Sequence, residues 1–131
     1  MNNIEDFLKL SYTASLSYYD GDLLSLYHNK ETNEFYLLLW CDVDDGVFTY
    51  VIVKVSEPRL YLFLKGKETL YKILTQSDDG FIHYIDNNKT GQWENMIKVD
   101  SKDIRVDYLP DETYIYDEEP KYVSSILCKL K

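Results

Sequence analysis

The stretch EFYLLLWCDVDDGVFTYVIVKV, from Glu34 to Val55, decides the fold of this chain. Its two halves, Glu34–Asp42 and Val47–Val55, are apolar at odd and even positions alike, as in strands that are covered on both faces. Asp44-Asp45-Gly46 between them favours a tight turn. The stretch therefore predicts the two central strands of an antiparallel sheet.

The preceding segment adds a hairpin. Ser11–Tyr18 alternates with a period of two, which predicts a strand whose apolar face consists of Tyr12, Ala14, Leu16 and Tyr18. Tyr19-Asp20-Gly21 is typical of a three-residue loop in which Gly21 takes the left-handed conformation. That loop sets Leu16 opposite Leu24. It also sets Ala14 opposite Leu26, so that one face stays apolar.

Two short helices are predicted after the central strands. Ser56 caps the first one, and Pro58 stands in its first turn, where no amide proton is needed. Gly66 ends this helix, and Thr69 caps the second. Their buried positions are predicted to be Leu60, Phe63 and Leu64, followed by Leu70, Ile73 and Leu74.

The ends of the chain complete the expected fold. Asn3 caps a short helix with Ile4, Phe7 and Leu8 on one face. Two further strands are expected at Phe81–Asp86 and Gln92–Val99, and Pro120 opens a terminal helix. We therefore predict a single α+β domain over residues 1–131, an antiparallel meander sheet of about six strands with short helices packed on one face.

Composition narrows the class of protein. The 131 residues carry 14 Lys plus Arg against 23 Asp plus Glu, for a net charge of -9. Nucleic acids and anionic membranes attract positive surfaces, so we expect neither as a direct partner. Two cysteines, Cys41 and Cys128, do not make a disulfide framework, and the N-terminus has no secretory signal, so a cytoplasmic location is expected.

No motif for catalysis, metal or cofactor is present. In a calcium loop counted from Asp42, the positions that need Gly and Glu hold Val47 and Val53. His28, His83 and the cysteines lack the close spacing of zinc ligands. Gly66-Lys67-Glu68-Thr69 lacks the upstream glycine of a phosphate loop. We therefore expect no catalytic residues, no metal and no cofactor.

The acidic, loop-rich segment 100–119 is the candidate site. It holds eight acids against Lys102 and Arg105, so that eight minus two gives -6 of the total -9. Carboxylates attract a basic partner over long range, and tyrosines supply contact area. The predicted partner-binding residues are Asp107, Tyr108, Asp111, Glu112, Tyr114, Tyr116, Asp117, Glu118 and Glu119.

Several short patterns also resemble a family of small bacterial and phage proteins known only as a domain of unknown function. They are Tyr18-Tyr19-Asp20-Gly21-x-Leu23-Leu24, Tyr36-Leu37-Leu38-x-Trp40-x-Asp42, Val53-x-Val55-Ser56-Glu57-x-Arg59-Leu60, Gly66-Lys67-x-Thr69-Leu70 and Asp107-Tyr108-Leu109-Pro110. The chain departs from the family pattern at Asp22, where proline is expected. The resemblance implies a bacterial or phage origin and a shared α+β scaffold, and it implies no activity.

These observations predict an acidic binding protein that neutralises or regulates a macromolecular partner by occlusion. An immunity protein, an antitoxin and a phage-encoded inhibitor of host defence all fit this description. Two alternatives stay open. One is a small enzyme or a domain that binds a nucleotide or another small ligand, which a deep pocket holding His28 or His83 beside converging carboxylates would favour. The other is a structural subunit of a larger assembly, for which a homo-oligomer is one form.

Overall fold

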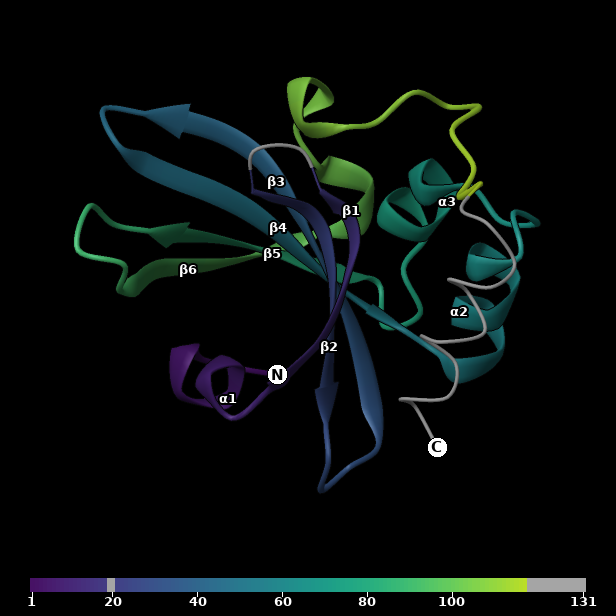
Figure 1. The fold of residues 1–131 in the computed structure, drawn as a ribbon, viewed down its shortest axis with the longest axis horizontal. Helices are drawn as coiled ribbons and strands as arrows, with labels where there is room; N and C mark the ends of the chain where they lie inside the picture. The colour runs from purple at the N-terminus through teal and green to yellow at the C-terminus, as the bar shows by residue number, and fades with distance from the viewer. Residues whose placement is uncertain (19–20, 118–131) are drawn as a thin grey trace.

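A six-stranded antiparallel meander forms the centre of the protein, in the order β1-β2-β3-β4-β5-β6. The computed structural model describes residues 1–18 and 21–117. Figure 1 shows the sheet with helices at two separate places beside it. The strands are β1 (Ser11–Tyr18), β2 (Asp22–Asn29), β3 (Glu34–Asp44), β4 (Val47–Val55), β5 (Phe81–Asn87) and β6 (Trp93–Asp100). The predicted fold class is confirmed.

The β3–β4 hairpin is the centre of the sheet, as expected. β3 continues two residues beyond the predicted Asp42, and Asp44 pairs with Val47. The connecting loop therefore has two residues, Asp45 and Gly46, with φ of 50° and 79°. Positive φ at both positions suits the strand twist of a tight hairpin, so the predicted turn lies here.

The β1–β2 hairpin corrects the predicted register. Ala14 pairs with Leu26 as expected, but Leu24 pairs with Ser17 instead of Leu16, because β1 is irregular at three places. One irregularity lies between Tyr12 and Ala14 and turns the Tyr12 ring to the opposite face. The single face predicted for Tyr12, Ala14, Leu16 and Tyr18 is therefore wrong. Residues 19 and 20 of the predicted loop lie outside the described residues.

Helices α2 (Glu57–Leu64) and α3 (Leu70–Thr75) cover one face of the sheet and begin at the predicted caps. The Ser56 and Thr69 hydroxyl oxygens accept from the backbone N–H groups of Arg59 and Lys72. The six predicted buried side chains of these helices are all buried. They pack on Phe35, Leu37, Val51, Val53, Val55 and Ile82 of the sheet.

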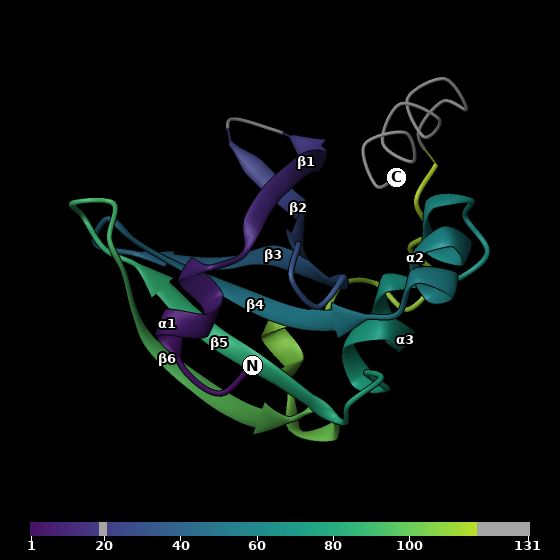
Figure 2. The ribbon, with the colours of Figure 1, turned by 90° about the horizontal axis from the view of Figure 1, so that it is seen from below.

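A second, smaller core lies on the other face. The short helix α1 (Ile4–Leu8) packs Phe7 there, against Tyr36, Leu38, Ile52 and Ile85. Helices therefore lie on both faces of the sheet, and not on one face as predicted. Leu8, predicted to share a helix face with Phe7, is exposed while Phe7 is buried. Figure 2 shows α1 apart from α2 and α3, on the other side of the twisted sheet.

The chain after β6 returns to the α2–α3 face as two short 3-10 turns, η1 (Ser101–Asp103) and η2 (Val106–Tyr108). Ile115 then forms an isolated antiparallel bridge with Thr69 at the start of α3. The terminal helix predicted from Pro120 lies outside the described residues. Within residues 1–18 and 21–117, no helix has the length and apolar character needed to cross a membrane.

Candidate partner-binding surface

The acidic segment presents its carboxylates to solvent. Asp107, Asp111, Glu112 and Asp117 are all exposed. Glu118 and Glu119, also predicted to bind a partner, lie outside the described residues. All the predicted partner-binding carboxylates that the structure describes therefore lie on the surface.

Two of the predicted contact tyrosines belong to the core instead. Tyr116 is 3% exposed and packs on Phe63 of α2, with ring centroids 5.5 Å apart. Tyr108 is 8% exposed and meets Tyr84 of β5 edge to face at 5.4 Å. Tyr108 and Tyr116 hold the segment on the protein and offer little area to a partner. Tyr114 is half-buried and lines a surface groove.

Arg105 compensates one of the exposed acids. Its guanidinium donates to both carboxylate oxygens of Asp107, at 2.7 and 3.1 Å, and lies over the Tyr108 ring at 4.5 Å. Arg105 of the same chain thus already supplies a positive charge to the Asp107 carboxylate. Asp107 therefore has less attraction left for a basic partner than the other exposed carboxylates of the segment.

Asp111 and Glu112 keep their charge available. The Thr113 hydroxyl and backbone N–H both donate to Asp111 Oδ1, and these bonds hold the pKa of Asp111 below its ordinary value. Neither residue has a Lys or Arg partner in the part of the chain that the structure describes. At neutral pH this corner of the surface is therefore anionic.

Two surface hollows adjoin these carboxylates, and Pro110 and Asp111 line both of them. The first, about 250 Å³, is mainly apolar and is completed by Ser17, Leu23, Leu24, Leu39, Leu70 and Tyr114. The second, about 540 Å³, is lined further by Tyr71, Val106, Leu109, Glu112 and Thr113. Val106 is 83% exposed, so this region combines free negative charge with uncovered apolar surface.

The structure also brings together a group that sequence reasoning missed. Asp22 at the start of β2 meets Trp40 of β3 and Phe48 and Tyr50 of β4 around a small hollow. The spacing of Phe48 and Tyr50 on a predicted strand places both rings on one face, and this signal was available in the sequence. The position of Asp22 beside them required the register of β1 and β2.

The two histidines and Cys41 lie on three different strands, in different surroundings. His28 Nε2 lies 2.9 Å from Asn33 Oδ1 and its ring stacks on Phe35. His83 is buried, and its Nε2 has no hydrogen-bond partner. Burial raises the pKa of Cys41 to about 12, so its thiol is not a nucleophile at neutral pH. Among residues 1–18 and 21–117, no three His, Cys, Asp or Glu side chains gather as a metal site would require.

Comparison of the chain with protein-family models, curated proteins and solved structures finds no match.

Proposed function

We propose that this protein binds a protein partner with a basic surface and neutralises or regulates it by occlusion. The partner would be a toxin, a nuclease or another cationic effector, and the protein would act as an immunity protein, an antitoxin or an inhibitor of host defence. One observation carries the proposal: Asp111 borders two hollows with apolar lining and Glu112 borders one of them, and neither carboxylate has a Lys or Arg partner among the described residues.

The two parts of this surface would do different work. Carboxylates at the rim attract a cationic partner and accelerate encounter, although each exposed charge adds little affinity. Partly or fully exposed apolar side chains such as Leu23, Leu39 and Val106 would lose contact with water in the complex and so supply most of the stability. A partner that lacks either basic charge or an apolar projection would bind poorly.

The test begins with affinity capture of the full chain from its native host, followed by purification of the captured protein. Binding is then measured for the unchanged protein and for the double variant Glu112→Lys/Asp117→Lys, which leaves the Asp111 turn intact. We expect the double reversal to weaken binding at least tenfold and to reduce the dependence of affinity on salt.

The matched control is Glu31→Lys/Glu94→Lys, which changes the net charge equally at two exposed carboxylates outside the segment. We expect this control to alter affinity far less. Equal affinity for the unchanged protein and the Glu112→Lys/Asp117→Lys variant would show that the partner binds elsewhere.

A further inference from the structure

A carboxylate lies among aromatic rings at one end of β2, β3 and β4, apart from the acidic segment. Gly21 and Asp22 line a hollow of about 50 Å³ together with Trp40, Phe48 and Tyr50. This volume is far below the roughly 300–1,000 Å³ of pockets that enclose small molecules. The hollow is large enough only for the end of a side chain or a similar small group.

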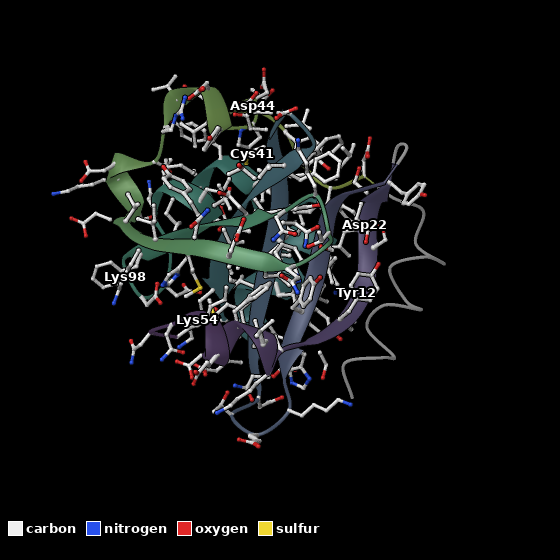
Figure 3. All side chains as sticks on the ribbon, turned by 90° about the vertical axis from the view of Figure 1, so that its left-hand side faces the viewer. Tyr12, Asp22, Cys41, Asp44, Lys54 and Lys98 are labelled. Atoms are coloured by element: carbon white, nitrogen blue, oxygen red, sulfur yellow. The ribbon has the colours of Figure 1, made fainter. Side chains whose placement is uncertain are left out.

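Asp22 carries a carboxylate that no basic residue in the described part of the chain neutralises. Its Oδ2 accepts a hydrogen bond of 2.9 Å from the Tyr12 hydroxyl, and Figure 3 shows these two side chains close together. No Lys or Arg of the described chain forms an ion pair with Asp22. Burial and this carboxylate together raise the pKa of Tyr12 to about 12.

The same charge reaches two more tyrosines. Burial first, and then the Asp22 carboxylate, raise the pKa of Tyr27 and of Tyr50. Three phenols on three different strands thus face one carboxylate. Such a site stabilises an added positive charge and disfavours an added negative one.

The aromatic rings around the hollow are held in place. Trp40 and Phe48 meet edge to face, with centroids 5.3 Å apart and planes at 78°. The Trp40 indole N–H donates to the Asp42 carbonyl oxygen at 2.9 Å, so its hydrogen-bonding group is already occupied. Tyr50 likewise packs against Trp93 at 5.3 Å. What these rings offer a ligand is their π faces and edges.

We propose that this hollow binds the guanidinium group of an arginine side chain that a partner protein presents. A guanidinium stacks on aromatic faces and pairs with a carboxylate through two N–H groups, and it is less strongly hydrated than an ammonium. Asp22 supplies the carboxylate, whose Oδ2 accepts the Tyr12 bond and whose Oδ1 accepts no hydrogen bond from residues 1–18 or 21–117, and Trp40, Phe48 and Tyr50 supply the rings.

The inference rests on the proposed function only in that a protein supplies the arginine. The hollow at Asp22 and the groove beside Asp111 share no lining residue, yet the start of β2 contributes to both. Gly21 and Asp22 line this hollow, and Leu23 and Leu24 line the apolar groove beside Asp111. A partner that grips this end of the β1–β2 hairpin would therefore contact both places.

The test uses a small probe, so that it is independent of the partner. Nα-acetyl-L-arginine methylamide is titrated into the full-length, ¹⁵N-labelled protein and followed by NMR. We expect saturable shifts at the Trp40 indole and at the amides of Gly21, Phe48 and Tyr50, with a dissociation constant in the millimolar range. The lysine analogue is expected to bind more weakly, and the neutral citrulline analogue not to bind.

Asp22→Asn is the decisive variant, because its amide oxygen can still accept the Tyr12 bond and so preserve the fold. We expect it to weaken arginine binding about tenfold. Asp44→Asn, at an exposed carboxylate at the end of β3, is the matched control and should leave binding unchanged. Trp40→Leu tests the aromatic part and should weaken binding while Asp22 remains.

Three results would overturn the inference. They are equal shifts with the citrulline analogue, binding by Asp22→Asn as tight as by the unchanged protein, and shifts confined to residues 107–117. Because Glu112→Lys/Asp117→Lys tests the acidic segment against the captured partner, failure of the arginine probe and failure of the proposed function are distinguishable.

Discussion

Replacing Gly66 with alanine is expected to destabilise the protein by about 3 kcal/mol, and Gly80→Ala by only about 1 kcal/mol. Both glycines have left-handed φ, of 73° and 81°, where an L-residue costs about 1 kcal/mol or slightly more. A methyl group at Gly80 meets no atom within 4 Å. At Gly66 it would lie 2.9 Å from the backbone oxygen of Tyr116.

The extra cost at Gly66 comes from this contact. Real Cβ atoms do not approach a backbone oxygen so closely, so the chain at Tyr116 must move. Tyr116 cannot move freely, because its buried ring packs on Phe63. Forcing an extra carbon into such packing costs roughly 1–3 kcal/mol, and we take about 2 kcal/mol as the difference between the two variants.

Urea denaturation followed by tryptophan fluorescence measures both free energies of unfolding. Hydrogen exchange of the amides from 111 to 117 should also accelerate in Gly66→Ala and stay unchanged in Gly80→Ala. Equal destabilisation by the two substitutions would refute the reasoning, since only the contact with Tyr116 separates them.

Three further outcomes are expected. Arg59→Met should lower the free energy of unfolding by about 3 kcal/mol in urea denaturation, because the Arg59 guanidinium donates to two backbone carbonyls at the end of α3, at 2.6 and 2.9 Å, and charge-assisted bonds contribute about 1.5 kcal/mol each. Lys54→Met breaks a more exposed ion pair and should lower it by less than about 1 kcal/mol. A loss as small in Arg59→Met would contradict this role of Arg59. Burial lowers the pKa of His83, so on acidification the unfolded chain takes up a proton near pH 6.5, before the folded protein does. The free energy of unfolding should therefore fall as pH drops below about 6.5, and fall less steeply in His83→Leu. Parallel pH profiles for the two proteins would argue against this role of His83. In the variant Cys128→Ser, the Cys41 thiol should react with a disulfide reagent at pH 8 far more slowly in the folded protein than in the protein unfolded by urea. Equal reaction rates would contradict the Cys41 pKa of about 12.

Local signals in the sequence were sufficient for most of the fold. Ser56, Thr69 and Asn3 act as caps because a hydroxyl or amide oxygen can satisfy a free N–H within three residues, and this requires no knowledge of the tertiary structure. The two-sided apolar pattern of β3 and β4 likewise reports burial on both faces. Each of these predictions depends only on neighbours in the chain.

The register of β1 and the burial of the loop tyrosines could not be predicted in this way. Irregular pairing between Tyr12 and Ala14 depends on how β1 fits β2 along its whole length, and it reverses the face of Tyr12. Tyr108 ends a three-residue 3-10 turn and Tyr116 lies outside the helices and strands, so neither stretch has a period long enough to indicate an inward side. Their partners, Tyr84 and Phe63, are distant in sequence, so only the assembled fold places the rings in the core.

The buried rings of Tyr108 and Tyr116 change the thermodynamics of any association through the acidic segment. Fixing a free backbone costs about 1–2 kcal/mol per residue in conformational entropy. Here folding has already fixed both ends of the stretch from 108 to 116, with the bridge between Thr69 and Ile115 adding a third fixed point. Binding therefore does not incur this entropy cost a second time, and the carboxylates of the segment keep a fixed spacing. The segment would therefore select among basic proteins by the arrangement of their positive charges, and not by their total charge alone.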